Sequence, residues 1–261
     1  MKISAALIRF GLAFACLAAG SLAPAFGQVL FSGSYSENFD EMGTAGTATP
    51  AGWFVRKGDT GAFTTAITTN AGGVVNSGVY NYGNANYGGG TSNRALVGIT
   101  STTTTTTSNL ELQLTNNTGA AITTLTLSFT GVQWYEDTAA KTLQFSYSLD
   151  GTSFTRASAF DFTSPATAAS ASTMNSAGNP PQTQAIGGTL TLSAPLAAGA
   201  TLDLLWYLPS AASANSVGLG IDNVSITSAV PEPGTIALAL VGALALILGR
   251  SRRGSALAAK D

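Results

Sequence analysis

Four segments of the sequence alternate apolar and polar residues with a period of two. The first, NLELQLT at 109–115, places Leu110, Leu112 and Leu114 on one face. The other three place these apolar residues on one face: Leu125, Leu127 and Phe129; Leu143, Phe145, Tyr147 and Leu149; and Leu202, Leu204, Trp206 and Leu208. This period with one apolar face is typical of half-buried antiparallel strands. No helical period occurs between residues 28 and 228.

Turn-forming residues separate these segments. Asp150-Gly151 lies between two apolar runs and is a strong hairpin signal, and TNNTGAA at 115–121 is a second turn. Roughly ten short strands at this spacing predict an all-β, antiparallel two-sheet sandwich of jelly-roll type. A closed barrel is the alternative.

Charged residues are sparse and mostly acidic. Residues 28–228 contain five basic and eleven acidic residues, a net charge of −6. No run of basic residues occurs there, so we predict no nucleic-acid partner.

The N-terminus has the features of a secretory signal peptide. Lys2 and Arg9 accompany an apolar stretch at 10–19, and small residues follow at 22–28. The stretch is too short for an N-terminal membrane anchor. We therefore predict a signal peptide at 1–27, export through the Sec translocon, and cleavage by signal peptidase after Ala25 or Gly27, of which we favour Gly27.

The exported chain would lack the residues of the common catalytic sites. The sequence contains no histidine, and its one cysteine, Cys16, lies within the predicted signal peptide and would be removed with it. This excludes disulfides, the common triads and thiol mechanisms, and disfavours zinc. Glycosidases need only two carboxylates, and Glu136 and Asp137 are candidates. Adjacent residues on a strand point to opposite faces, so we predict no catalytic residue and no enzyme.

Two sequence motifs, one near the start and one near the end of the predicted β-sandwich domain, resemble a known class of domain. SYSENFDEM at 34–42 and GLGIDNVSIT at 218–227 resemble the first and last strands of jelly-roll domains similar to carbohydrate-binding modules. The resemblance implies that these strands lie side by side and that nearby acidic side chains hold a structural calcium ion. Glu37, Asp40 and Asp222 are the candidate ligands, since Ca²⁺ prefers oxygen ligands. The alternative is that they are solvated or hydrogen-bonded carboxylates at strand ends. No other cofactor is expected.

Residues 70–93 are rich in glycine, asparagine and tyrosine, and we expect an exterior loop there. Sugar sites on β-sandwiches use exposed aromatic rings with amides nearby. Tyr80, Tyr82 and Tyr87 alternate with asparagines and are the candidate glycan contacts. The alternative is that these rings pack within the loop or over the core.

The C-terminus combines a Pro-Glu-Pro turn, an apolar segment and an arginine cluster. Pro231, Glu232 and Pro233 forbid a helix and give an extended entry. The segment at 236–249 has no polar side chain and would form a helix of about 21 Å, against about 30 Å of hydrocarbon. Arg250, Arg252 and Arg253 follow and should stay cytoplasmic. A helix this short would span the membrane only marginally, which suits a segment that holds the protein at the membrane until it is processed. The alternative is a permanent C-terminal anchor.

These three parts, in this order, resemble the PEP-CTERM sorting signal of Gram-negative bacteria that make exopolysaccharide. The resemblance implies that exosortase, an integral-membrane enzyme, cleaves near the Pro-Glu-Pro. The predicted organisation is a signal peptide at 1–27, a β-sandwich at 28–228, a sorting segment at 229–254 and a cytoplasmic tail at 255–261. Within the sorting segment, the motif is 231–233, the transmembrane helix 235–249 and the basic cluster 250–253.

The predicted function is that of an exported, non-enzymatic protein associated with exopolysaccharide or biofilm matrix. It would pass through the inner membrane and reach the cell envelope, the surface or the exterior. The alternatives are a dedicated carbohydrate-binding module and, less favoured, a carboxylate-dependent glycan-active enzyme.

Overall fold

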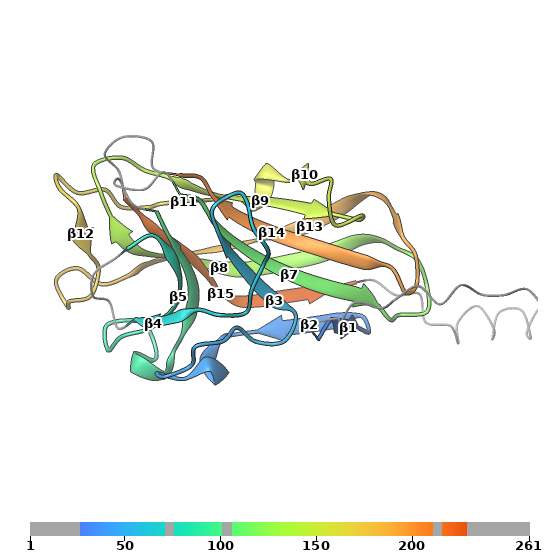
Figure 1. Ribbon diagram of the computed structural model, residues 1–261, viewed down its shortest axis with the longest axis horizontal. Coiled ribbons are helices and arrows are strands. Elements are labelled where there is room, and N and C mark those ends of the chain that lie inside the picture. The colour runs from blue at the N-terminus through green and yellow to red at the C-terminus, as the bar shows by residue number, and fades with distance from the viewer. Residues whose placement is uncertain (1–26, 71–75, 101–105, 211–215, 229–261) are drawn as a thin grey trace, which may run out of the picture.

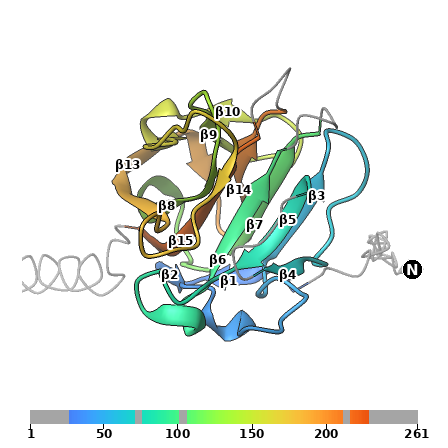
Figure 2. The same cartoon turned by 90° about the vertical axis from the view of Figure 1, so that its left-hand side faces the viewer.

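The computed structural model describes residues 27–70, 76–100, 106–210 and 216–228, which form two packed β-sheets. The predicted signal peptide up to residue 26 and the whole C-terminal sorting segment lie outside the described residues. Figures 1 and 2 show β7 and β14 in one layer and β8, β13 and β15 in the other. The predicted all-β two-sheet sandwich is thus confirmed.

The first sheet has seven strands in the order β1-β7-β14-β9-β10, with β3 also on β7 and β11 also on β9. Their bounds are β1 Val29–Phe31, β3 Trp53–Lys57, β7 Ser108–Asn116, β9 Thr142–Ser148, β10 Thr155–Arg156, β11 Phe162–Thr163 and β14 Thr201–Leu208.

The second sheet has eight strands in the order β12-β8-β15-β6-β5-β4, with β13 also on β8 and β2 also on β15. Their bounds are β2 Ser34–Glu37, β4 Thr68–Asn70, β5 Gly78–Tyr82, β6 Ala95–Ile99, β8 Ile122–Glu136, β12 Ser172–Thr173, β13 Gln182–Leu196 and β15 Gly218–Thr227. Three short 3₁₀ helices connect strands within the described chain: η1 Asp40–Met42, η2 Gly90–Ser92 and η3 Ser158–Phe160.

The four alternating segments form strands as predicted, and their apolar faces fill the space between the sheets. The indole of Trp206 on β14 lies at its centre, with ring centroids 5.5 Å from Trp53, 5.6 Å from Phe129 and 5.1 Å from Phe145. Trp53 also donates a 2.7 Å hydrogen bond from its indole nitrogen to the hydroxyl of Tyr35. Aromatic pairs therefore join strands of both sheets.

The Asp150-Gly151 turn connects β9 to β10 as the hairpin signal predicted. Gly151 has a φ of 73°, which glycine adopts without strain. One carboxylate oxygen of Asp150 accepts hydrogen bonds from the backbone amides of Ser153 and Thr152 and from the Ser148 hydroxyl. These bonds hold the pKa of Asp150 below its usual range.

Two features of the fold differ from the sequence prediction. The strand pairs β1–β7 and β4–β5 are parallel, so the sheets are not purely antiparallel. The predicted exterior loop at 70–93 contains β5, in which Val79, Asn81 and Tyr82 are buried. The polar composition of this segment did not indicate a strand, because the buried Asn81 and Tyr82 have their partners within the protein.

The last strand, β15, holds the second sheet together. It pairs with β8 on one side and with β6 and β2 on the other. Its side chains Leu219, Ile221, Val224 and Ile226 are at most 1% exposed. The final backbone hydrogen bond of the described chain is donated by the amide of Ser228 to the carbonyl of Gly33.

A chain of residues 28–228 should therefore fold cooperatively, whereas one ending at Val217 should not. Losing four buried aliphatic side chains removes roughly 6–12 kcal/mol of burial free energy, comparable to the whole stability of a domain. Circular dichroism during urea unfolding measures both chains. A cooperative transition in the chain that ends at Val217 would contradict this role of β15.

Candidate functional site

The first and last strands lie side by side, as the resemblance implied. In the antiparallel β2–β15 pair, Glu37 is opposite Val224. A bulge at the Asp222/Ser225 step gives Asn223 a φ of 50°, and Phe39, just after β2, has a φ of 60°. Both values are uncommon for residues other than glycine.

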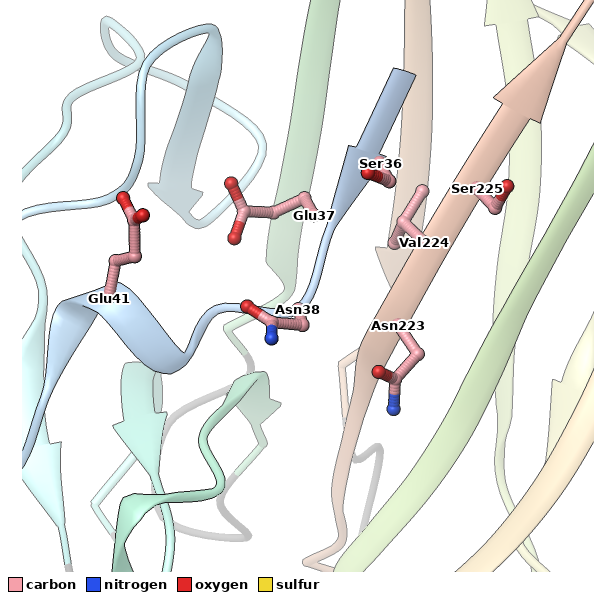
Figure 3. A pocket seen from close by; sticks show the side chains of 7 residues that line it. All are labelled: Ser36, Glu37, Asn38, Glu41, Asn223, Val224 and Ser225. Atoms are coloured by element: carbon pink, nitrogen blue, oxygen red, sulfur yellow. The ribbon is translucent and has the colours of Figure 1, made fainter. Parts of the chain in front are cut away.

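A polar pocket of about 450 Å³ opens beside this junction. Figure 3 shows the side chains of its lining, which are Ser36, Glu37, Asn38, Glu41, Asn223, Val224 and Ser225. A second hollow of about 360 Å³ shares Glu37 and Glu41 and adds the more apolar Tyr35, Met42 and Pro50.

The three predicted calcium ligands meet in this region but have protein partners. Glu37 accepts a 2.6 Å hydrogen bond from the amide of Phe39. The two oxygens of Asp40 accept from the amide of Arg94 and the side chain of Asn38. Those of Asp222 accept from the Tyr87 hydroxyl, at 2.6 Å, and the amide of Asn223, at 2.7 Å.

The carboxyl group of Asp222 is fully buried. Burial raises its pKa to about 6, and repulsion from Asp40 and Glu37 adds to this, while the bonds from Tyr87 and Asn223 oppose it. Burial likewise raises the pKa of Glu37. Over the described parts of the chain, no group of three or more such side chains is placed to hold a metal ion. A structural calcium ion held by Glu37, Asp40 and Asp222 stays a prediction.

Two of the three predicted glycan contacts, Tyr82 and Tyr87, are not the exposed rings that the prediction required, and Tyr80 is half-buried. Tyr82 is 0% exposed and Tyr87 is 5% exposed. Both rings pack against Trp134, at centroid distances of 4.9 Å, and form a second apolar cluster on the second sheet with Val97 and Val132. Tyr80 lies against this cluster and donates its hydroxyl to the Asn76 carbonyl. Tyr82 and Tyr87 are buried because they pack against Trp134, whose side chain lies on the side of the second sheet that faces away from the core.

Arg94 anchors the same segment and was not predicted. Its guanidinium is buried and donates to the carbonyls of Gly83, Thr91, Asn70 and Asn81 and to the side-chain oxygen of Asn81. The five N–H groups of an arginine are thereby accounted for. Arg94 lines a hollow of about 160 Å³, but it has no donor left for an anion. The sequence offered no signal for it beyond a lone basic residue in a polar segment.

Glu136 and Asp137 are buried rather than solvated, and they hold loops in place. Glu136 accepts a 2.8 Å hydrogen bond from the side chain of Asn179. Asp137 accepts from the amides of Thr138 and Ser216. Both carboxylates thus have structural partners.

The outward side of the first sheet carries a different set of side chains, which we call the outer face. Its residues alternate with those of the core on β3, β7, β14, β9 and β10, and Figure 1 shows this sheet in front of the other. Cross-strand pairing places them in two rows: Phe54, Glu111, Leu205, Ser146 and Arg156; and Arg56, Asn109, Tyr207 and Gln144.

Aromatic and charged groups meet on the outer face. The Arg56 guanidinium lies 4.4 Å from the ring centroid of Phe63. The half-buried Tyr207 hydroxyl bonds to Asp59, and burial raises its pKa. Half-buried Gln113 and Gln144 lie on the same side. Such a mixture of rings, amides and guanidinium can stack on and hydrogen-bond to a polar ligand.

Two buried carboxyl groups, Glu111 and Asp203, lie beneath this face on neighbouring strands. Burial raises the pKa of Glu111 to about 7, opposed by a bond from Gln113 and by Arg56 and reinforced by Asp203. Burial and the charge of Asp150 raise the pKa of Asp203 to about 6. The alternation of β7 placed Glu111 outward correctly, but it did not indicate that this position would be buried.

Comparison with known proteins identifies the C-terminal segment. The family described as "PEP-CTERM protein-sorting motif" matches residues 229–253. The chain carries a PEP-CTERM sorting motif. The match covers Pro231, Glu232 and Pro233 and the arginines at 250, 252 and 253, all outside the described residues. Within the described ranges, no helix is long and apolar enough to cross a membrane. No curated protein matches the chain.

Solved structures resemble the sandwich at low identity. The K2 cleaved adhesin domain of Lys-gingipain is 16% identical, with 74% of this chain and 97% of that chain covered and a TM-score of 0.43. A CBM22-1 xylan-binding domain from Paenibacillus barcinonensis is 14% identical, with 74% and 92% covered and a TM-score of 0.33. The N-terminal cellulose-binding domain of a Cellulomonas fimi β-1,4-glucanase is 16% identical, with 71% and 93% covered and a TM-score of 0.32.

The buried carboxyl groups make stability depend on pH. A pKa raised in the folded state stabilises the protein below the unfolded pKa, and this contribution is lost as the pH rises through the folded value. For Glu111, Asp203 and Asp222 the loss should fall between about pH 4 and 7. The free energy of unfolding, measured in urea from pH 4.5 to 8, should therefore decrease across this window.

Glu111→Gln isolates one of these groups. It should raise the free energy of unfolding at pH 8 by on the order of 1–2 kcal/mol and change it little at pH 4.5, because only the charged form is penalised. An unchanged pH slope in this variant would show that Glu111 does not titrate in this range.

Proposed function

We propose that the protein is exported, held at the inner membrane by its C-terminal segment, and processed there by exosortase. The match at 229–253 supports this proposal, since a PEP-CTERM motif implies an exported protein that is membrane-anchored before processing. The Sec translocon and signal peptidase would act on residues 1–27. The processed protein would reach the envelope, surface or exterior of a Gram-negative bacterium.

The described fold is compatible with processing at this place in the chain. Its last backbone bond is at Ser228, and the motif begins at Pro231. Cleavage there would leave every described strand in the product.

Replacing Pro231, Glu232 and Pro233 by alanine should stop processing, because the recognised turn is removed. The precursor should then accumulate in the membrane fraction, as immunoblots of membrane, envelope and medium would show. In a second variant, alanine replaces the three arginines at 250, 252 and 253. This variant should disturb the orientation of the C-terminal segment in the membrane instead. Normal release of the Pro-Glu-Pro variant would contradict exosortase recognition.

For the delivered sandwich, we propose binding to a glycan of the exopolysaccharide or biofilm matrix through the outer face, without catalysis. The observation that carries this is the set of half-buried Tyr207, Phe63 and Gln144 beside Arg56 on one face of a rigid sheet. Aromatic rings can lie against sugar rings while amides and guanidinium bond to hydroxyl groups. The second sheet uses its outward aromatics for internal packing instead.

Tyr207→Ala should weaken binding to matrix polysaccharide at least about tenfold, or about 1.4 kcal/mol, because a ring on the central strand β14 is lost. Affinity electrophoresis in gels containing the extracted polysaccharide measures this. Tyr80→Ala is the matched control on the other sheet, and it should bind normally. Loss of binding in the Tyr80 variant alone would move the site away from the outer face.

A carboxylate-dependent glycan-active enzyme is the alternative function. The hydrogen bonds of Glu136 and Asp137 to loop residues make them poor candidates for proton transfer. Incubation with the same polysaccharide should release no reducing ends or unsaturated products. Turnover by the wild-type protein that is lost when a carboxylate is replaced by its amide would overturn the non-enzymatic proposal.

A further inference from the structure

The end of the sandwich from which the C-terminal segment leaves has a distinct composition. Three turns, at 32–33, 116–121 and 196–200, lie next to Ser228 and are connected by hydrogen bonds. We call these turns and Ser228 the exit end. The amide of Asn116 donates to Ala200, and its side chain donates to the carbonyls of Ala120 and Leu196. The amide of Ser228 donates to the carbonyl of Gly33, which ties the chain's departure point to these turns.

The three turns of the exit end carry no charged side chain, and the exposed Asp150 of the β9–β10 turn lies beside them, just after the Ser148–Asp203 pair. Residues 28–36, 112–124, 194–202 and 223–228 contain no aspartate, glutamate, lysine or arginine. Exposed positions there include Asn117, Ala198 and Leu30, the last being 63% exposed. Figure 1 shows the turns after β7 and β13 at the right-hand end and β12 at the opposite end. That opposite end carries the turn between β8 and β9, with Asp137 and Lys141.

The chain length beyond Ser228 limits which part of the sandwich can approach the membrane. Pro231 is three residues after Ser228, and the start of the apolar segment at 236 is eight residues after it. In any conformation these spans reach at most about 10 Å and 28 Å. Strand β8 alone, with 15 residues, is on the order of 45 Å long. An anchored sandwich thus keeps its exit end close to the lipid surface.

Charge favours the same orientation. Residues 28–228 carry a net charge of −6, and a bilayer surface that contains anionic lipids repels acidic groups within about a Debye length. If the sandwich lay on its side, Glu37, Asp40 and Glu41 of the junction pocket could approach the headgroups. Standing on the exit end keeps these three carboxylates away and presents the three uncharged turns, with Asp150 as the exposed acidic side chain beside them.

We propose that the exit end is a lipid-facing surface, on which the sandwich stands while the C-terminal segment anchors it. This inference rests on the anchoring part of the proposed function. The partner is the bilayer surface itself, and the sorting enzyme would then approach the motif from within the membrane beneath the exit end.

Single cysteines can test this, because the only native cysteine is Cys16. Residues 28–261, which lack the predicted signal peptide and therefore any native cysteine, carry Ala198→Cys, are labelled with an environment-sensitive fluorophore and are reconstituted into phosphatidylcholine–phosphatidylglycerol vesicles with spin-labelled headgroups. Ala140→Cys, in an exposed turn at the opposite end, is the matched control. Because the two ends are on the order of 45 Å apart, quenching at 198 should exceed that at 140 at least about twofold.

Several outcomes are distinguishable. The excess quenching at 198 should shrink when phosphatidylglycerol is omitted or salt is raised, because charge repulsion sets the orientation. Equal quenching at both positions, or none at 198, in chain that floats with the vesicles overturns the inference while leaving anchoring intact. Chain that does not float with the vesicles refutes the anchoring itself. Quenching at 198 seen only in native membranes containing the sorting enzyme would assign the exit end to that protein rather than to lipid.

Discussion

The packing of Trp206 between the two sheets is the interaction on which the rest of the structure depends. Its ring contacts aromatic rings from β3, β8 and β9, so one side chain joins three strands of the first sheet to β8 of the second. The exported chain would have no disulfide, and it must therefore gain its stability from apolar burial. The hydrogen bond from Trp53 to Tyr35 extends this centre to β2, and through β2 to the last strand.

Around this centre, the two outward sides of the sandwich are used differently. The second sheet is covered by its own 83–94 segment, which Arg94 and the bond from Tyr87 to Asp222 hold in place. Its outward aromatics are consequently part of the protein's interior. The outer face of the first sheet keeps Tyr207, Phe63 and Arg56 partly accessible, and binding is proposed there for that reason.

The sequence predicts the strands well where the period of two is strong. Leu110, Phe145 and Trp206 occupy the core positions expected of them, because alternation directly reports which side of a strand is apolar. It cannot report whether the other side is covered. Glu111 and Asn109 alternate with the core leucines of β7 and face away from the core, yet both are buried.

The candidate site was only partly predictable, for a related reason. The adjacency of 34–42 and 218–227 followed from the resemblance and is confirmed by the β2–β15 pairing. Tyr82 and Tyr87 were misplaced because composition does not distinguish a polar loop from a polar segment closed over an outward tryptophan, here Trp134. The outer face was missed because its residues are separated in sequence and meet only through strand pairing.

The sorting motif and the sandwich together describe a folded unit that ends just before its processing site. Mass spectrometry of the C-terminus of the native protein, from separated membrane, envelope and medium fractions, tests this most directly. After processing, the protein in the envelope or medium should end between about Pro231 and Thr235, next to the recognised turn. A chain that continues through Asp261 in every fraction would contradict processing and leave a permanently anchored sandwich.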